Sequence, residues 1–507
     1  MNNKQRVLIN LFATLFAFCV QFGINFFLTP YIINELGSES YSFIPLTNNI
    51  VSYTNILTVA FYSMTARFIA IESNRGNDEK ANVFFNSALL ANCVLSFVLI
   101  IPAVVVTMSA EHLISIPSNL VSDVKITFAF SFTNMLLSLA LSAFGSVFYV
   151  KNRLDLSAKK NIEGNLIRAT VLILLFTLFP AKIYFLNATM LVVTLYLTTT
   201  NIRYMHKLMP EIKVDHGKFS FEAMKEMLSS GIWNSFNQAS NVLLLSLDLL
   251  LANLFLGSAA SGTYSVSKTV PSFVLSIVST LIPVFAPQFV KYYAQNKRVE
   301  LKQSIDFGVK CMGMLCAVPI GFLIVFGKEF LHLWVPTQNA DELYPLSTLA
   351  LVTVAISCCS LVLSNIFTAA NKLRVPAFVL FGLGIFNTVV VILLIKLTPL
   401  GIWAIPITSL ITNIIRNLIF VPIYSARCLE LSWKEIYLPL FKGMACMVIM
   451  CAVCFVYHRY ISAASWGGLI VAGIVCSIIA CLINLMILFT KNERSQFLDK
   501  LLRRRSA

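Results

Sequence analysis

The sequence predicts an all-α polytopic membrane protein with about fourteen transmembrane helices. Of its 507 residues, 58% are hydrophobic and only 12% are charged, whereas soluble chains carry about 25% charged residues. Apolar runs long enough to cross a bilayer recur along the whole chain, and basic residues gather in alternate connections between them. These features exclude a soluble multidomain enzyme. They also exclude a disordered chain, which would need low hydrophobicity and high net charge.

Fourteen stretches reach the roughly 20 mostly apolar residues that a membrane crossing requires. The first is too long for the core of a signal peptide and no small-residue cleavage site follows it, so we expect it to remain as a helix. The predicted spans are 7–33, 44–71, 82–108, 125–150, 163–180, 183–202, 228–256, 262–291, 306–327, 344–370, 375–397, 400–426, 437–458 and 466–490.

Lysine and arginine residues orient these helices. With the N-terminus on the cytoplasmic side, 28 of the 38 basic residues fall in inside segments, five in outside loops and five within helices. Cytoplasmic segments carry an excess of this kind. The pattern therefore predicts an even helix number with both termini cytoplasmic. The net charge of +15 then reflects topology, and we expect no nucleic-acid partner.

The chain repeats itself at an offset of 220 residues, and the basic turn after the second helix recurs as well. The matches pair Leu36-Gly37-Ser38 with Leu256-Gly257-Ser258, Ser52 with Ser272, Ala66 with Ala286, and 74–80 with 296–302. Two parallel six-helix repeats are therefore predicted, followed by two extra helices. Transporters built from parallel halves bind substrate between the halves and rock to alternate access.

The repeat and the helix count together predict five segments. They are an N-terminal six-helix lobe (1–205), a cytoplasmic linker (206–226), a C-terminal six-helix lobe (227–427), two additional helices (428–492) and a basic cytoplasmic tail (493–507).

Charged residues within the spans need a reason, because a charge at mid-membrane costs roughly 2.5–3.5 kcal/mol. Arg67, Arg168, Lys310 and Arg416 lie near cytoplasmic helix ends, where long side chains reach the headgroups. Each of these is either an anchor or a contact in a transport pathway, and Lys310 is the weakest pathway candidate.

Asp248 and Lys268 lie deeper, on two helices joined by a short loop. One reading makes them a structural ion pair. The other makes Lys268 a contact for a substrate anion, with Asp248 adjusting it or carrying an ion. The two readings are compatible.

Neutral polar residues form stripes along several spans. Asn234, Asn241 and Asp248 are spaced by seven and so would share one helix face. Such stripes can join helices to one another, but stripes at matching repeat positions favour a shared hydrated cavity. The further members are Asn237 beside this face, Gln21 and Asn25 in the first span, Asn48 and Ser52 in the second, and Lys268 with Ser272 in the eighth.

The sequence contains no catalytic constellation. It has no phosphate-binding GxxxxGK[ST], no HExxH and no GxSxG motif, and its five histidines form no ligand spacing. We therefore expect a membrane transporter rather than an enzyme, with no catalytic residue, no metal site and no cofactor.

Several runs resemble bacterial polysaccharide flippases of the Wzx type, which belong to the multidrug/oligosaccharidyl-lipid/polysaccharide (MOP) exporter superfamily. They are Phe27–Ser38, Asn48-Asn49, Ser63–Phe68, and Tyr264–Lys268 after Leu256–Ser258. The resemblance covers the whole topology of six plus six plus two helices. It implies a fold like that of the superfamily's multidrug exporters, the MATE transporters.

The resemblance also implies a function. Such flippases move an undecaprenyl-diphosphate-linked oligosaccharide, an O-antigen or related repeat unit, from the inner to the outer leaflet of the bacterial cytoplasmic (inner) membrane. Its implied partners are this cargo, membrane lipid, a polysaccharide polymerase and chain-length machinery. Asp248 is the candidate for coupling to H⁺ or Na⁺. The candidate cargo contacts are Lys268, Arg67, Arg168, Arg416, Asn48, Ser52, Gln21, Asn25, Asn234, Asn237, Asn241 and Ser272.

Two alternatives stay open at this point. A cation-coupled drug exporter of the same superfamily would use acidic residues for its cationic cargo. Away from the span ends, five basic residues and one acidic residue lie within the spans, which favours an anionic cargo instead. An O-antigen polymerase would be expected to have a large outside loop, and a membrane scaffold has no need of repeated polar stripes.

Overall fold

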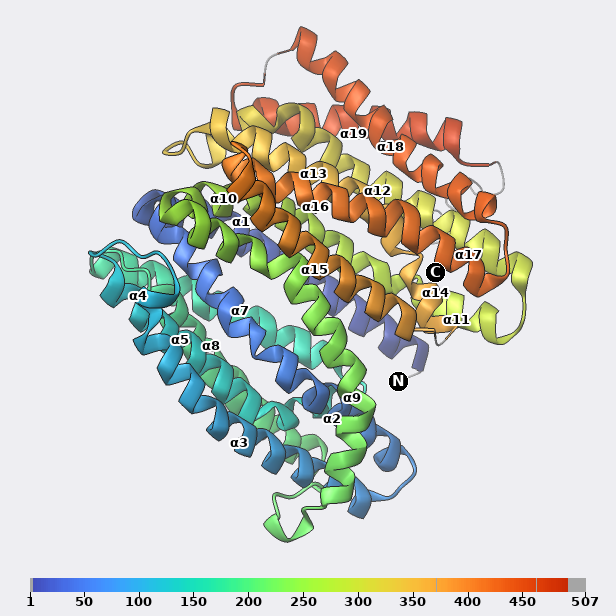
Figure 1. Ribbon diagram of the computed structural model, residues 1–507. Helices are drawn as coiled ribbons and strands as arrows, with labels where there is room; N and C mark the ends of the chain where they lie inside the picture. Colours follow the sequence, from blue (N-terminus) through green and yellow to red (C-terminus); the bar gives the residue numbers. More distant parts are fainter. Residues whose placement is uncertain (1–2, 371, 462, 491–507) are drawn as a thin grey trace. The chain divides into compact units, whose positions relative to one another are not determined.

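The computed structural model describes residues 3–370, 372–461 and 463–490, and every regular element in this part is helical (Figure 1). The α-helices are α1 (Asn3–Tyr53), α2 (Asn55–Asn74), α3 (Asp78–Met108), α4 (Ala110–Leu113), α5 (Val121–Ala140), α6 (Val147–Val150), α7 (Leu154–Leu178), α8 (Phe185–Leu208), α9 (Phe221–Asn241), α10 (Leu247–Leu281), α11 (Ala286–Ala294), α12 (Arg298–Trp334), α13 (Ala340–Leu361), α14 (Ser364–Ala369), α15 (Arg374–Leu397), α16 (Ala404–Ile414), α17 (Val421–Leu429), α18 (Trp433–Tyr460) and α19 (Trp466–Leu488). Two π-helical segments, η3 (Val242–Ser246) and η6 (Ile415–Phe420), interrupt the series.

Twelve of the described helical segments are long and apolar enough to cross a membrane. A thirteenth is added if Val121–Ala140 and Ser142–Val150, bent by 60°, form one span. The predicted count of fourteen stays a prediction. It depends on how two continuous segments are divided, because Phe12–Tyr53 has 42 residues and Phe221–Ala294 has 74, and both are longer than one crossing needs.

Both long segments break at a glycine that the sequence repeat identifies. Gly37 has φ 79° and ψ 160°, and Gly257 has φ 89° and ψ 175°. Essentially only glycine adopts this region of backbone space. An added Cβ would meet nothing within 4 Å at either position, so the backbone angle, and not crowding, requires glycine. The repeat seen in the sequence is therefore also a repeat of local structure.

Helix starts follow the same offset of 220 residues. Helix α3 starts at Asp78 and α12 at Arg298, while α7 starts at Leu154 and α15 at Arg374. The predicted match of 74–80 with 296–302 is wrong by two residues. The left-handed turn residues show the true register, because Gly76 (φ 75°) corresponds to Asn296 (φ 53°).

The chain divides into two compact units, Met1–Gly262 (unit 1) and Thr263–Ala507 (unit 2). The division falls within α10, so α9 packs in unit 1 with the helices of the first repeat. There α9 lies so close to α2 that a Cβ on Gly231 would be 1.9 Å from the carbonyl oxygen of Ala60. This division does not test the predicted lobe boundaries, which stay a prediction. The predicted basic tail, 493–507, lies outside the described residues.

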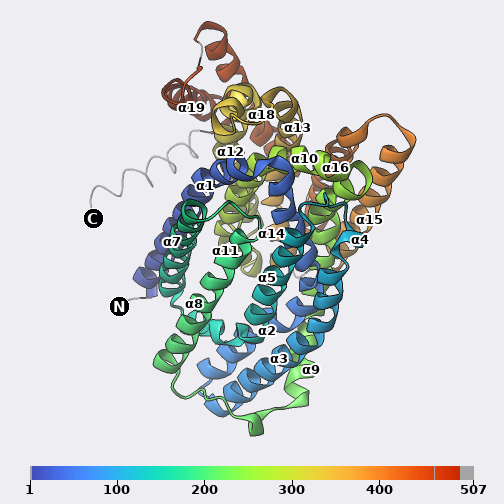
Figure 2. The same cartoon turned by 90° about the vertical axis from the view of Figure 1, so that its left-hand side faces the viewer.

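Unit 1 is built on paired long helices. Helices α1 and α7 run side by side (Figure 2), α3 packs on α2 and α5, and α5 packs on α8. Apolar side chains from α2, α3, the turn 142–146, α6, α8 and α9 form one buried cluster. Its members include Ile69, Phe84, Phe85, Phe144, Phe148, Met205 and Met227.

Helix α7 starts earlier than the predicted span 163–180, and this changes the environment of one lysine. The sequence analysis counted Lys160 as an inside-segment residue, but it lies within α7 and is 7% exposed. Its ammonium donates a hydrogen bond to Asn201 and lies 4.5 Å from the centre of the Phe148 ring. An amide oxygen and an aromatic face thus replace water around this buried cation.

Unit 2 is organised around α12, which packs along α18 and also contacts α13 and α19 (Figure 1). Glycines allow the closest approach. A Cβ on Gly313 would lie 2.4 Å from the carbonyl oxygen of Gly443, and one on Gly321 would lie 2.6 Å from the Met450 side chain. Small residues let transmembrane helices pack backbone to backbone. The two extra helices are thus joined to the second repeat through α12.

Candidate substrate-binding residues

Arg168 and Asn25 meet between α7 and α1 in unit 1. Arg168 Nη1 donates to Asn25 Oδ1 at 3.1 Å. Arg168 Nε is buried and has no hydrogen-bond acceptor among the described residues, and its guanidinium forms no ion pair within them. An arginine offers five donors in a planar fork, so most of its donor capacity is open to another group.

Asn48 belongs to a hydrogen-bonded chain that joins three helices of unit 1. Ser131 Oγ of α5 donates to Asn48 Oδ1 at 3.2 Å, and Asn187 Nδ2 of α8 donates to Ser131 Oγ at 2.6 Å. Asn187 also bonds the carbonyl oxygen of Thr127 at 3.3 Å. Asn48 therefore helps to hold helices together, and part of its hydrogen-bonding capacity is used in doing so.

The π-helical segment η3 presents a backbone carbonyl to α1. Asn49 Nδ2 and Tyr53 Oη both donate to the carbonyl oxygen of Ser246, at 3.3 and 3.2 Å. π-helical turns inside α-helices often lie at functional sites. Asp248 follows two residues later, is 3% exposed and lies within electrostatic range of Tyr53. The sequence analysis missed Asn49 and Tyr53, although Asn49 directly follows the selected Asn48.

The same π-helical segment, η3, interrupts the polar stripe that the sequence predicts along span 228–256. A seven-residue spacing predicts one shared face for Asn234, Asn241 and Asp248 only if the helix is regular. Because η3 lies between Asn241 and Asp248, the register shifts there. Asn241 is exposed and Asp248 is buried, while Asn234 and Asn237 are partly buried. The prediction that Asp248 continues the asparagine face is therefore wrong.

The remaining unit 1 candidates are more open. Gln21 and Arg67 are exposed. Ser52 is partly buried, and its hydroxyl donates to the carbonyl oxygen of Asn49 at 2.7 Å. That bond lies within one helix, so the Ser52 oxygen can still accept a hydrogen bond.

In unit 2, the predicted stripe on α10 is a continuous helix face. Lys268 is partly buried, with its ammonium 5.6 Å from the centre of the Tyr264 ring. Ser272, Ser276 and Ser279 are exposed, and each hydroxyl donates to the carbonyl four residues earlier, at 2.8 to 2.9 Å. The face therefore presents one ammonium and a row of hydroxyl oxygens. Lys268 and Asp248 belong to different units, and their pairing stays a prediction.

Arg416 lies in η6, beside an amide cluster. Its Nε is buried, and the guanidinium has no hydrogen-bond or ion-pair partner among the described residues. On the same helix, Asn417 Nδ2 donates to Asn413 Oδ1 at 3.1 Å and to Ser357 Oγ at 3.0 Å. Asn417 is fully buried, and no described residue donates a hydrogen bond to its Oδ1. Asn413 and Asn417 are four residues apart, a spacing that could have identified them in the sequence.

No group of three or more metal-ligating side chains occurs within the described residues. What unites the candidate positions is chemistry suited to a polar anion: two arginines that keep free donors, a lysine beside hydroxyls, and several amides. Guanidinium groups suit phosphate because their donors match two phosphate oxygens at once.

The fold and these residues define a multi-span membrane protein with charged and polar side chains inside its spans. Residues 7–289 match the model of the family described as "Polysaccharide biosynthesis protein", and the chain belongs to that family. It is 29% identical over 493 residues to a protein of Bacillus subtilis (strain 168) described as "Uncharacterized membrane protein EpsK", with 97% of each chain covered.

Solved structures share the fold at low sequence identity. An outward-facing MATE family transporter of the MOP superfamily is 12% identical, with a TM-score of 0.62 over 85% of this chain and 98% of that one. An inward-facing MATE family transporter of the same superfamily is 14% identical to this chain. Its TM-score is 0.58, and the match covers 83% of this chain and 95% of that one. A third structure is a MOP superfamily transporter from Pyrococcus furiosus, whose "reverse polarity of binding pocket suggests different function". It is 13% identical to this chain with a TM-score of 0.61, and the match covers 83% of this chain and 95% of that one. The family and the fold confirm the predicted class, a multi-span membrane protein of polysaccharide biosynthesis with the fold of MATE family transporters.

Proposed function

We propose that this protein moves an undecaprenyl-diphosphate-linked oligosaccharide from the inner to the outer leaflet of the bacterial cytoplasmic membrane by alternating access. Both termini then lie on the cytoplasmic side, as the distribution of basic residues predicts. Membership of a polysaccharide biosynthesis family supports a saccharide cargo. Such a cargo carries a diphosphate and a hydrated sugar, neither of which enters hydrocarbon unaided.

One observation carries the proposal. Each compact unit holds an arginine within a membrane span whose buried Nε has no hydrogen-bond acceptor among the described residues, Arg168 in unit 1 and Arg416 in unit 2. A buried donor left unsatisfied costs free energy, so a ligand that supplies acceptors to these groups would gain that free energy on binding. A diphosphate supplies both negative charge and oxygen acceptors.

The neutral candidates suit the saccharide. Hydroxyl groups of a sugar both donate and accept hydrogen bonds, as do the amides of Asn25, Asn234 and Asn237 and the hydroxyls of Ser52 and Ser272. Lys268 and Arg67 add positive charge. In this proposal each arginine, within its own unit, offers donors to the diphosphate during transport, while the polar stripes replace water around the sugar.

Asp248 is the candidate for energy coupling. It is the only acidic residue that the predicted spans hold away from their ends, and it is buried next to the π-helical turn η3. Binding of H⁺ or Na⁺ would neutralise it. The hydrogen bonds of Asn49 and Tyr53 to Ser246 would then relay the change to the second predicted span. A polysaccharide polymerase and chain-length machinery are the partners we expect to receive the cargo.

The decisive test is reconstitution. Purified protein in vesicles is given a fluorescent undecaprenyl-diphosphate oligosaccharide, and the fraction that reaches the opposite leaflet is measured over time. Arg416→Met and Arg168→Met should each slow transport about tenfold or more, because each removes charge-assisted hydrogen bonds to phosphate. Arg75→Met is the matched control, since Arg75 is exposed and pairs with Glu72 at 3.0 Å.

Undiminished transport by both variants would reject the proposal. The drug-exporter alternative is addressed in the same vesicles with a cationic dye. Dye transport without movement of the lipid-linked saccharide would replace the proposed cargo by a cationic one.

A further inference from the structure

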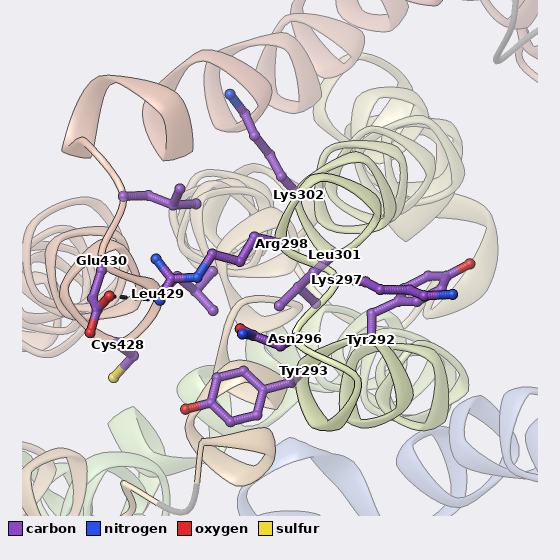
Figure 3. A pocket seen from close by; sticks show the side chains of 11 residues that line it. Tyr292, Tyr293, Asn296, Lys297, Arg298, Leu301, Lys302, Cys428, Leu429 and Glu430 are labelled. Atoms are coloured by element: carbon purple, nitrogen blue, oxygen red, sulfur yellow. Dashed lines mark hydrogen bonds and ion pairs between the residues drawn. The ribbon is translucent and has the colours of Figure 1, made fainter.

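A pocket of about 210 Å³ lies in unit 2 where two helix-to-helix turns meet, and we name it the turn pocket. One turn joins α11 to α12, and the other joins α17 to α18. In Figure 3, Arg298 reaches across toward Glu430, while Tyr293 and Asn296 lie beside the same space. The lining residues are Tyr292, Tyr293, Asn296, Lys297, Arg298, Leu301, Lys302, Cys428, Leu429, Glu430 and Leu431.

The turn pocket has more positive than negative charge. Lys297, Arg298 and Lys302 line it, against one lining carboxylate, Glu430. Arg298 Nη2 lies 2.8 Å from Glu430 Oε2, and the two side chains are 59% and 72% exposed. Lys302 forms an ion pair with Glu435, outside the lining. An exposed ion pair contributes little to stability, so an external anion can replace Glu430 on Arg298 at small cost.

The corresponding turn of the first repeat has the opposite charge at its helix start. Asp78 begins α3 where Arg298 begins α12. The Asn77 side chain caps α3 by accepting a hydrogen bond from a backbone N–H at 3.0 Å, and the buried carboxylate of Glu72 holds Arg75 at 3.0 Å. The first turn is therefore closed by its own side chains. The second turn places a guanidinium beside a cavity.

The surroundings of the turn pocket are those of a membrane surface. It lies where α11 and α17 end and where α12 and α18 begin, and all four helices belong to candidate membrane spans. Tyr292 and Tyr293 line it, and Trp433, 56% exposed, begins α18. Tyrosine and tryptophan concentrate at membrane–water interfaces, and basic pockets between transmembrane helices bind anionic headgroups. The basic residues predict that this surface is the cytoplasmic one.

We propose that the turn pocket binds the phosphate of an anionic phospholipid headgroup. Arg298 is the main contact, and Glu430 is the internal anion that competes for it. Lys297 and Lys302 add positive charge. A bound headgroup displaces Glu430 from Arg298 and lies between the start of α12 and the connection that leads into α18. The lipid thereby stabilises the junction between the second repeat and the two extra helices, independently of any cargo.

Lipid binding is measured on the full chain in nanodiscs of phosphatidylcholine, with and without phosphatidylglycerol. Native mass spectrometry counts retained phosphatidylglycerol, and a melting curve reports the stabilisation. Inorganic phosphate added to the phosphatidylcholine nanodiscs forms a separate arm. We expect phosphatidylglycerol, and not free phosphate, to raise the melting temperature.

Two substitutions give effects of opposite sign. Arg298→Gln should weaken phosphatidylglycerol retention about tenfold, because it removes a charge-assisted hydrogen bond. Glu430→Gln should strengthen retention, because it removes the competing carboxylate. Arg75→Gln, in the corresponding turn of the first repeat, is the matched control and should change neither phosphatidylglycerol retention nor the rise in melting temperature that phosphatidylglycerol causes.

Equal losses of melting temperature for Arg298→Gln and Glu430→Gln in both lipids, with unchanged retention, would show a purely structural ion pair and overturn the proposal. Stabilisation by inorganic phosphate equal to that by phosphatidylglycerol would also overturn it, since the occupant would then be a soluble phosphate. If Arg298→Gln does not fold, Glu430→Gln alone decides, because stronger retention requires that the carboxylate competes with lipid.

Discussion

Arg168 in unit 1 and Arg416 in unit 2 are the same residue type, each within a membrane span and each with a buried Nε. Arg168 is held by Asn25, whereas Arg416 has no hydrogen-bond or ion-pair partner among the described residues. The difference shows that a cation inside a span can be positioned in advance by the fold or left to be satisfied by what it binds. In the absence of a ligand, the unsatisfied buried charge of Arg416 therefore lowers the stability of the fold.

Two fully buried asparagines, one in each unit, differ in the same way. Asn253 of unit 1 is fully buried and uses both ends of its side chain. Its Oδ1 accepts from the backbone N–H of Ser115 at 2.8 Å, and its Nδ2 donates to the Ser115 carbonyl at 3.1 Å. Asn417 of unit 2 is as deeply buried, but its Oδ1 has no donor within the described part of the chain. The same residue type therefore joins two segments by hydrogen bonds at one position and keeps an unused hydrogen-bond acceptor at another.

The largest expected effect is a loss of transport in both arginine variants, which should differ from each other in stability. Arg416→Met should leave the melting temperature unchanged or raise it, because it removes an unsatisfied buried cation, while transport falls about tenfold or more. Arg168→Met should lower transport too. It should also lower the free energy of unfolding by about 0.5–1.5 kcal/mol, because Asn25 loses its donor. Melting curves and vesicle transport measured on the same preparations test this.

A clear loss of stability in Arg416→Met would contradict the comparison, because it would reveal a structural partner for Arg416. Equal stability of the two variants would show that the Asn25 bond has no positioning role.

A smaller effect is expected at the two buried asparagines. Asn253→Ala leaves the Ser115 N–H and carbonyl without partners and should cost about 1–3 kcal/mol. Asn417→Ala should cost less, because it also removes an unsatisfied oxygen from the interior. Equilibrium unfolding of both variants in detergent checks the order. A larger loss for Asn417→Ala would mean that its Oδ1 is satisfied in the native protein.

The smallest effect concerns a partly exposed ion pair of unit 1, between Lys125 and Glu111. The hydrogen bond from the Lys125 ammonium lowers the pKa of the Glu111 carboxyl below its ordinary value. A lowered folded-state pKa stabilises the fold above the unfolded-state pKa of about 4.3, and this contribution disappears as the pH falls through the folded-state pKa. The difference in melting temperature between the native protein and Glu111→Gln should therefore be small at pH 7 and should disappear as the pH falls through the folded-state pKa. A difference that persists in acid would assign Glu111 another role.

Much of the fold was predictable because its signals are local. Length and hydrophobicity identify the spans. The offset of 220 residues located both glycine breaks, since only glycine suits the backbone angles of Gly37 and Gly257. The cationic residues within the spans were also found from sequence, because charge in an apolar run is rare and costly.

Hydrogen-bond partners could not be predicted in the same way. The sequence marks Asn48 and Arg168 as polar, but it does not show that Asn48 bonds Ser131 or that Arg168 bonds Asn25. These contacts span 83 and 143 residues of chain, and they exist only once the helices pack. Asn49 and Tyr53 were missed for the same reason, because their acceptor is a backbone carbonyl that any residue could supply.

By itself, the sequence determined the helical class, the two repeats and the excess of positive charge within the spans, because each follows from properties of short segments. Only the tertiary structure decided which face each polar residue occupies and which groups remain open. The π-helical turn η3 shows the reason. Its extra residue separates Asp248 from the asparagine face of α9, and it is accommodated by packing and by the bonds of Asn49 and Tyr53 to Ser246. A periodicity read along the chain assumes a regular helix, and packing is free to break that assumption.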